Sequence, residues 1–265
     1  MVLHQGDFDY KDDPLAWDMQ IDETLGPDFP YFASVGNHDL NAWTGYQARL
    51  RERLERVEGA ACSGELGVNS SCRYRGLFFA LSGVGTMGAD HGPFLREALT
   101  SDRSEWRICT WHKNQRAMQI GGKRDEVGWD AYEICRRHGA IVVTGHEHSY
   151  ERTLTLSNVR DSEVDTTCVD DPDTPDPDVC IGPGSTVVFV SGLGGKDIRD
   201  QERCLPVSHP YGCNGEWAKI YSKDQSAQFG ALFITFDTDP GARVARGYFK
   251  TIDGDVVDSF TITRR

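Results

Sequence analysis

The stretch AIVVTGHEHSYER (residues 140–152) joins an apolar run to two histidines, His146 and His148, which lie two residues apart. The run AIVVT is typical of a short buried strand, because branched apolar residues dominate it and a glycine follows. Histidines at the end of such a strand either pack within the fold or face a ligand, and the stretch alone does not separate these interpretations.

Other short apolar runs in the first half of the chain share this strand pattern. They occupy residues 1–4, 31–35, 77–83 and 107–111, followed by 140–144. Helical periodicity lies between several of these runs, over residues 46–57, from Pro93 to Leu99 and over residues 129–135. Gly59 and Gly139 follow two of the helical segments as stop signals. Strands that alternate with helices predict an α/β layered domain.

The second half of the chain reads as strands joined by loops and turns. The apolar runs there are 186–190, 231–236, 242–250 and 256–263. The turn signals TDPGAR and IDGD predict hairpins between the last of them. Two packed sheets with helices outside satisfy both halves of the chain, within a single domain over residues 1–265. An acidic, proline-rich insert at 161–180 is typical of a solvated surface loop.

The charge and hydropathy of the chain exclude some classes of partner. The chain has 265 residues and a formal net charge of −13, which suits a nucleic-acid backbone poorly. No apolar run approaches the roughly 20 residues that a membrane-spanning helix needs. We therefore expect no nucleic-acid partner and no membrane association, and the sequence does not indicate an oligomeric state.

Six of the eight cysteines form close pairs within polar, loop-like stretches. The pairs are Cys62 with Cys72, Cys168 with Cys180, and Cys204 with Cys213. We predict local disulfides, and hence an oxidising compartment; the alternative is reduced loop cysteines in a cytosolic protein. Cys109 and Cys135 lie in apolar surroundings, which favours buried thiols.

The disulfide prediction favours a secreted protein. The triplet NSS at Asn69 is a glycosylation acceptor pattern within the first cysteine loop. The strand that begins the sequence leaves no room for an export signal, so we expect a signal peptide upstream of Met1.

Four stretches at the ends of predicted strands carry residues of metal-ligand type. They are GDFDY (6–10), GNHD (36–39), TWHKN (110–114) and GHEHSYER (145–152). In α/β sheets, ligands gather beyond the carboxyl ends of the strands, so the four stretches are expected to converge. Carboxylate, amide and imidazole donors suit Zn, Fe or Mn better than a thiolate-binding metal.

This motif series, in this order, resembles that of the calcineurin-like metallophosphoesterases. The tyrosine three residues after Asp7 and the ending GH-x-H-x-YER are similar to the purple acid phosphatase branch in particular. The resemblance implies a four-layer α/β/β/α sandwich of two mixed sheets. It also implies a two-metal site that hydrolyses phosphate esters by attack of a metal-bound hydroxide, with a small phosphorylated molecule as substrate.

The resemblance also implies roles for individual residues. Asp7 would bridge two metals, Asn37, His112 and His146 would complete one of them, and Tyr10 and His148 would serve the other. Tyr10 would favour Fe at its position, paired with Zn, Mn or Fe. His38 would stabilise phosphate charge and protonate the leaving oxygen, oriented by Asp39. Lys113 and Asn114, which follow His112, are weaker candidates for contact with phosphate.

The chain departs from the family pattern at its start. Only six residues precede Asp7, so the first family motif, an Asp that ends an upstream strand, is absent together with its strand–helix unit. Three interpretations stay open: a truncated sequence, a variant with a weakened or single-metal site, or a non-catalytic secreted metal-binding descendant. We expect phosphomonoesters as substrates, with a phosphodiesterase or nucleotide-acting enzyme as the alternative.

Overall fold

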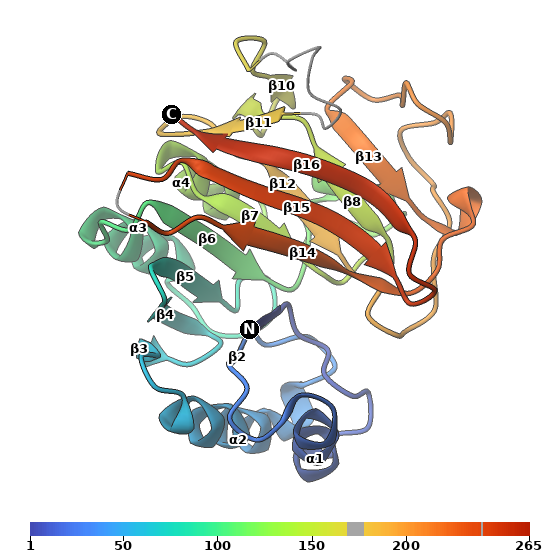
Figure 1. Cartoon of the computed structure of the whole chain (residues 1–265). Helices are drawn as coiled ribbons and strands as arrows, with labels where there is room; N and C mark the ends of the chain where they lie inside the picture. The colour runs from blue at the N-terminus through green and yellow to red at the C-terminus, as the bar shows by residue number, and fades with distance from the viewer. Residues whose placement is uncertain (169–177, 240) are drawn as a thin grey trace. The chain divides into compact units, whose positions relative to one another are not determined.

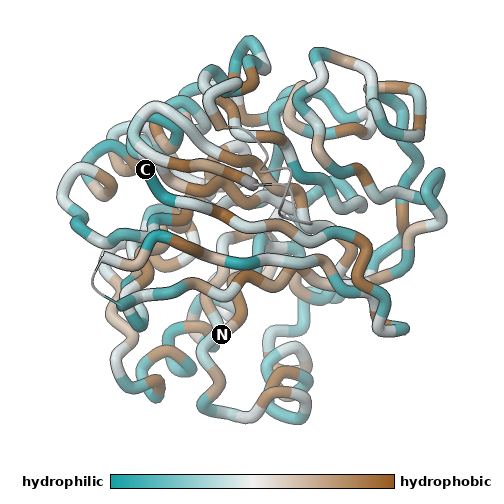
Figure 2. Tube along the Cα trace, turned by 45° about the horizontal axis from the view of Figure 1, so that its top comes forward, coloured by the Kyte–Doolittle hydropathy of each residue, from teal (hydrophilic) through white to brown (hydrophobic). Residues whose placement is uncertain are grey.

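The structure is a computed structural model that describes residues 1–168, 178–239 and 241–265 (Figure 1). The chain divides into two compact units, Met1–Lys113 and Asn114–Arg265. No helix of the described residues is long and apolar enough to cross a membrane, and the hydrophobic segments of the trace in Figure 2 are short. Part of the predicted acidic insert, residues 169–177, lies outside the described residues.

The first unit contains two small groups of strands and three α-helices. Its strands are β1 (Val2–His4), β2 (Tyr31–Ala33), β3 (Ala61–Glu65), β4 (Asn69–Tyr74), β5 (Leu77–Ser82) and β6 (Trp106–Trp111). Its helices are α1 (Pro14–Leu25), α2 (Trp43–Arg56) and α3 (His91–Ser101), with a short 3-10 turn, η1 (Leu40–Ala42), before α2.

Strands β1 and β2 run parallel, and α1 forms the crossover between them. Asp13 caps α1, because its side chain accepts the N–H of Ala16 while Pro14 occupies the first turn. The helix is fixed by aromatic packing, since Trp17 stacks on Phe8 with ring centroids 4.6 Å apart. This packing anchors the loop that follows β1.

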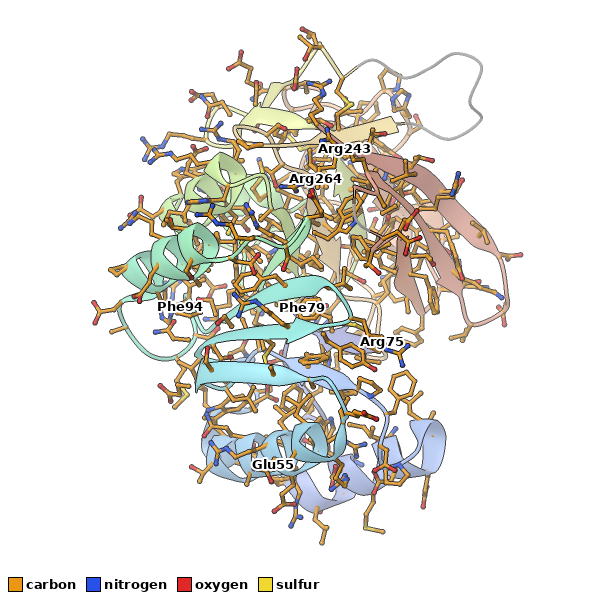
Figure 3. The ribbon with its side chains drawn as sticks, turned by 60° about the vertical axis from the view of Figure 1, so that its left-hand side comes forward. Glu55, Arg75, Phe79, Phe94, Arg243 and Arg264 are labelled. Carbon is orange, nitrogen blue, oxygen red and sulfur yellow. A yellow bond between two sulfur atoms is a disulfide. The ribbon has the colours of Figure 1, made fainter. Side chains whose placement is uncertain are left out.

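The remaining strands of this unit form the order β3-β4-β5-β6, in which β3, β4 and β5 are antiparallel and β6 is parallel to β5. Cys62 and Cys72 lie opposite each other on β3 and β4 and form a disulfide. Phe79 on β5 is buried in the core of this unit, whereas Glu55 on α2 is exposed; both side chains are labelled in Figure 3.

The second unit contains one helix, α4 (Asp130–Arg137), among its described residues, two short 3-10 turns and two larger sheets. The 3-10 turns are η2 (Arg116–Met118) and η3 (Lys223–Gln225). One sheet has the order β13 (Trp217–Tyr221), β8 (Tyr150–Thr153), β12 (Val188–Ser191), β7 (Ile141–Thr144). The other has the order β11 (Asp178–Ile181), β16 (Val256–Arg264), β15 (Val244–Thr251), β14 (Gly230–Phe236). A small ladder joins β9 (Leu156–Asn158) to β10 (Glu163–Val164).

These two sheets of the second unit contact each other through side chains of β8, β15 and β16. Tyr150 stacks on Phe249 with ring centroids 4.3 Å apart. Arg152 is 1% exposed and bonds both oxygens of Asp258, at 2.8 and 2.9 Å. The guanidinium also lies over the ring of Phe260, 4.8 Å from its centroid. Tyr150 and Arg152 therefore hold the two sheets of the second unit together.

Most sequence predictions about the fold are confirmed. Each predicted strand and each predicted helix is present, with bounds that differ by a few residues. An α/β fold with mixed sheets is confirmed, since parallel and antiparallel pairs occur in the same sheet. The single domain over 1–265, the four-layer stacking and the loss of an upstream strand–helix unit stay predictions.

The three predicted local disulfides are confirmed as Cys62–Cys72, Cys168–Cys180 and Cys204–Cys213. The prediction for the other two cysteines is wrong. Cys109 and Cys135 are disulfide-bonded rather than thiols, so none of the eight cysteines, all of which lie in the described residues, is free. Apolar surroundings are equally compatible with a buried disulfide, and residues far apart in sequence give no pairing signal.

Candidate metal centre

The loops after β1 and β2 meet backbone to backbone in the first unit. A Cβ on Gly36 would lie 2.1 Å from the backbone nitrogen of Asp7, and one on Gly6 would lie 2.4 Å from that of Gly36. Asp7 and Tyr10 both have positive φ, at 60° and 57°. A positive φ costs a non-glycine residue conformational free energy, so contacts with the surrounding structure must hold Asp7 and Tyr10 in this conformation.

Asp39 organises these two loops. Its carboxylate accepts the N–H of Gly36 at 2.7 Å, of Asp7 at 2.9 Å and of Phe8 at 2.8 Å. Burial raises the pKa of Asp39, and the three N–H groups oppose this shift. Among the described residues, no hydrogen bond joins the Asp39 carboxylate to His38, which Asp39 was expected to orient. Asp39 positions the backbone of Asp7 instead.

Four oxygen and nitrogen donors converge within the first unit. His112 Nε2 lies 3.2 Å from Asp7 Oδ2 and 3.1 Å from Asn37 Oδ1, and the Tyr10 hydroxyl lies 3.3 Å from Asp7 Oδ2. Donors about 2.1 Å from a shared ion, at angles of roughly 90–110°, are separated by roughly 3.0–3.4 Å. The spacing of the cluster therefore fits metal ligands.

The partners of His112 and Asp7 support this assignment. The His112 Nδ1 atom lies 2.7 Å from the carbonyl oxygen of Gln5, which can only accept, so Nδ1 carries the hydrogen and Nε2 faces the cluster. Burial alone would raise the pKa of Asp7, but His112 and the backbone N–H of His38 outweigh it and lower that pKa. Asp7 is therefore an ionised carboxylate beside an imidazole nitrogen.

His38 is exposed, beside the cluster. Its backbone N–H donates to Asp7 Oδ1 at 2.8 Å, and its ring lies 4.6 Å from the ring of Tyr10. The structure thus places Asp7, Tyr10, Asn37 and His112 close together, with the exposed His38 beside them.

The second unit carries the remaining predicted histidines at the end of β7. His146 has a φ of 62°, and its Nε2 lies 2.9 Å from Glu126 Oε2. His148 donates from Nδ1 to the carbonyl of Asp197 at 2.8 Å. Burial, followed by the charges of Arg199 and Lys123, lowers the pKa of His148 to about 4, so its ring is neutral at pH 7.

The weaker candidates have different surroundings. Asn114 is fully buried and donates from Nδ2 to Thr144 Oγ1 at 2.7 Å, which gives it a role within the fold. Lys113 is partly exposed. Contact of these two side chains with substrate stays a prediction.

Gln5 and Glu126 are the functional neighbours that the sequence did not single out. Gln5 acts through its backbone carbonyl, for which no side-chain pattern exists. Glu126 lies in the polar stretch GGKRDEVG, in which nothing in the sequence distinguishes Glu126 from the neighbouring Asp125. Only the hydrogen bond to His146 distinguishes it.

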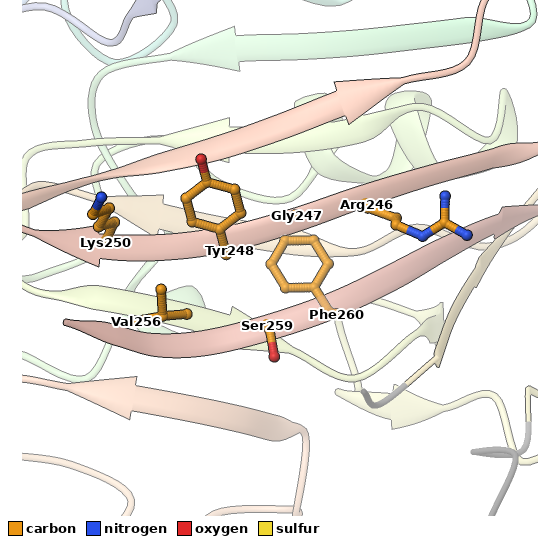
Figure 4. A pocket seen from close by; sticks show the side chains of 7 residues that line it. All are labelled: Arg246, Gly247, Tyr248, Lys250, Val256, Ser259 and Phe260. Carbon is orange, nitrogen blue, oxygen red and sulfur yellow. The ribbon is translucent and has the colours of Figure 1, made fainter. Parts of the chain in front are cut away.

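A hollow of 380 Å³ lies on β15 and β16 of the second unit (Figure 4). Arg246, Tyr248, Lys250 and Phe260 are among its lining residues, and it contains none of the predicted site residues. The candidate chemistry of this chain is therefore not in that hollow.

Comparison with known proteins gives one family and one informative structure. The model of the family described as calcineurin-like phosphoesterase matches residues 1–150. A purple acid phosphatase from yellow lupin (Lupinus luteus) seeds has a similar fold, with a TM-score of 0.64 and 18% identity. The match covers 99% of this chain and 46% of the lupin chain, so this chain spans about half of that protein's length.

The structure of PhoD has a TM-score of 0.37 and 11% identity, covering 89% of this chain and 57% of that one. This similarity is too low to support an argument. No curated protein matches the chain.

Proposed function

The chain belongs to the calcineurin-like phosphoesterase family, and on this premise we propose that it hydrolyses phosphomonoesters with the help of bound metal ions. The observation that carries the proposal is the cluster of Asp7, Asn37, His112 and Tyr10, whose donor atoms have the spacing of ligands on shared ions. The similarity in fold to a purple acid phosphatase supports the same activity.

The proposed ligand set joins the cluster to the two histidines after β7. Asp7, Asn37, His112 and His146 would hold one ion, and Asp7, Tyr10 and His148 would hold the other. Oxygen and imidazole donors fit Fe paired with Zn, Mn or Fe, and every cysteine is committed to a disulfide. Such ions supply positive charge for phosphate oxygens and lower the pKa of bound water.

The side chains of the chain itself have separate tasks in this proposal. Asp7 Oδ1 accepts a hydrogen bond from the backbone N–H of His38, and this bond keeps the exposed imidazole of His38 beside the cluster. From there His38 can donate a proton to the leaving oxygen of a phosphomonoester. Asp39 maintains the geometry by holding the loops of Asp7 and Asn37 together.

Metal content and hydrolysis, measured together, test the proposal. We expect the purified chain, loaded with Fe, Zn or Mn, to bind metal and to hydrolyse a chromogenic phosphomonoester. His38→Ala should lower kcat roughly 10²–10⁴-fold with unchanged metal content, whereas Asn37→Ala should lower the metal content. Glu55→Gln, on the surface of α2, is the control. A fully loaded protein that is inert toward this substrate would contradict the proposal and favour a metal-binding protein.

The role of Tyr10 has its own spectroscopic test. A tyrosine hydroxyl on Fe(III) gives a visible charge-transfer band, which we expect in the iron-loaded protein. Tyr10→Phe should abolish the band, since it removes the phenolic oxygen 3.3 Å from Asp7 Oδ2. An iron-loaded wild-type protein without colour would contradict this ligand assignment.

We also propose that the protein is secreted. The disulfides indicate an oxidising compartment. Thiol titration of the denatured, unreduced protein isolated from its source should find no free thiol, and free thiols at all eight cysteines would contradict the proposal.

A further inference from the structure

The sheet formed by β11, β16, β15 and β14 has a face that is turned toward solvent. Along β15 buried and exposed side chains alternate, and Arg246, Tyr248 and Lys250 are on the exposed side. On β14 the exposed positions include Phe233, which lies directly opposite Tyr248. The hollow of 380 Å³ lies on this outer face, because all three exposed residues of β15 line it (Figure 4).

Tyr248 and Phe233 form an aromatic pair beside the hollow. Their rings stack with centroids 5.1 Å apart and an angle of 17° between the ring planes. The two residues are 37% and 46% exposed, and exposed apolar groups that gather in this way mark binding surfaces. Phe233 covers one face of the Tyr248 ring, and only Tyr248 of the pair lines the hollow. The other face of Tyr248 is therefore available to a ring that enters the hollow.

Packing within the second unit fixes the floor of the hollow. A Cβ on Gly247 would lie 2.2 Å from Cζ of Phe260, so the Phe260 ring takes the space that a side chain at position 247 would need. The guanidinium of Arg152 lies 4.8 Å from the centroid of that ring, and its two hydrogen bonds to Asp258 hold it there. The hollow is thus formed before any ligand binds, which lowers the entropy cost of binding.

The charged residues that line the hollow are both cations. Arg246 and Lys250 lie on either side of Tyr248 along β15 (Figure 4), and four residues of strand separate them by about 13 Å. The outward positions of β14, β15 and β16 carry no carboxylate, and neither cation has an ion pair among the described residues. In a chain with a formal net charge of −13, this local charge favours an anionic ligand.

These groups together fit a sugar chain. A sugar ring presents C–H groups on its face, and the face of Tyr248 attracts them because aromatic faces carry partial negative charge. Ser259 and Thr261 lie opposite Tyr248 and Arg246 on β16, where their hydroxyl groups can exchange hydrogen bonds with sugar hydroxyls. Acidic groups of the chain would pair with Arg246 and Lys250. A nucleic-acid strand also stacks on aromatic rings, but its affinity comes from many phosphate contacts, and this hollow offers two cations.

We propose that the hollow on β15 and β16 binds an acidic glycan chain. One sugar ring stacks on Tyr248, and acidic groups on either side of that ring pair with Arg246 and Lys250. The spacing of the two cations selects a chain of several sugar units whose acidic groups are widely spaced. This binding is separate from the proposed hydrolysis, because the hollow contains none of the proposed metal ligands.

Affinity electrophoresis through partly methyl-esterified polygalacturonate, whose free carboxylates are spaced along the chain, tests the proposal. The polymer should retard the wild type, and the fully esterified, neutral polymer should retard it less. Tyr248→Ala should weaken binding roughly 3–10-fold, and the double variant Arg246→Gln/Lys250→Gln roughly 10-fold. Lys223→Gln is the matched charge control, since the Lys223 side chain is 67% exposed outside the hollow, and it should bind like the wild type.

Several results would overturn the proposal. The wild type may show no retardation, the neutral polymer may retard it equally, or the double charge variant may bind equally well. Tighter binding to poly(U) than to the polysaccharide would identify a nucleic-acid surface instead. Self-association of the wild type that Tyr248→Ala abolishes, without retardation by the polymer, would identify a contact between two copies of the chain. Thermal unfolding checks that each variant is folded, and the double charge variant decides the outcome where Tyr248→Ala is not.

Discussion

Asp39 in the first unit and Glu147 in the second are both fully buried carboxyls beside predicted ligands, and they are satisfied in different ways. Asp39 accepts three backbone N–H groups with its two oxygens. Neither oxygen of Glu147 has a hydrogen-bond partner among the described residues. Its compensation is charge, from Lys123 and from Arg199, whose Nη1 lies 3.6 Å from Oε2.

This difference distinguishes two ways of building a ligand loop. Hydrogen bonds from N–H groups are directional, so the loop of Asn37 is fixed by geometry. Coulomb attraction at 3.6 Å is less directional, so the buried carboxyl of Glu147, between His146 and His148, is stabilised mainly by charge. The stability of the Asn37 loop should therefore depend mainly on backbone and side-chain geometry. The stability of the loop around Glu147 should depend more on nearby charges.

Glycine substitutions give the largest expected effect. A Cβ on Gly36 would lie 2.1 Å from the Asp7 nitrogen, and one on Gly192 would lie 1.8 Å from the carbonyl oxygen of Glu147. Both contacts involve backbone, which cannot swing away, so each alanine variant should lose roughly 3–5 kcal/mol of stability by denaturant unfolding. Gly194→Ala is the matched control, since no atom lies within 4 Å of its Cβ. A tolerated Gly192→Ala would show that the loop after β7 is the softer of the two.

Substitution of Asp39 or Lys123, whose side chains hold these two loops, should have the next largest effect on stability. Asp39→Ala leaves three backbone N–H groups without their acceptor and should cost roughly 2–4 kcal/mol. Lys123→Met removes one hydrogen bond to the His146 carbonyl and one charge near Glu147, and should cost roughly 1–2 kcal/mol. Thermal unfolding with intact disulfides measures both. Added salt should weaken only the contribution of Lys123, and equal salt dependence in the two variants would contradict the distinction.

The sequence predicted the loops that carry the proposed ligands because the signal of each loop is local. Asp7, Asn37 and His146 each follow an apolar run beside a glycine, and the structure shows why those glycines are needed at Gly6 and Gly36. Helix α1 escaped prediction, since only Trp17 and Ile21 are buried on it and no apolar face repeats. Strand β3 escaped prediction because it is exposed along its whole length, and β4 because its sequence NSSCRY is polar although half of it is buried.

The side-chain partners within the site were less predictable than the ligands. The sequence placed Asp39 next to His38 and suggested a hydrogen bond between them, but the carboxylate turns toward the backbone of Asp7 and Phe8. Sequence adjacency does not fix side-chain direction. The contact of Glu126 with His146 spans 20 residues and depends on the path of a loop, which no periodicity encodes.

A gradual, pH-dependent effect is expected for Glu151, which follows the histidine loop on β8 and is fully buried. Burial raises the pKa of Glu151 to about 8, with the Ser149 hydroxyl opposing and the charge of Glu147 adding to the shift. In the unfolded chain the carboxyl has its ordinary pKa of 4.5. The folded state therefore keeps its full advantage below that pH and loses it as the pH rises through about 8.

Glu151→Gln removes this ionisation while preserving shape. Compared with wild type, the variant should have similar stability at pH 5 and become more stable as the pH rises, by roughly 4 kcal/mol at pH 8.5. Melting temperatures across this range, without added metal, measure the difference, and exposed Glu163→Gln should show none. A stability difference that stays constant with pH would mean that Glu151 is already ionised in the fold. The loop after β7 would then hold two buried negative charges, and its dependence on Lys123 and Arg199 would be greater than the single carboxylate of Glu147 requires.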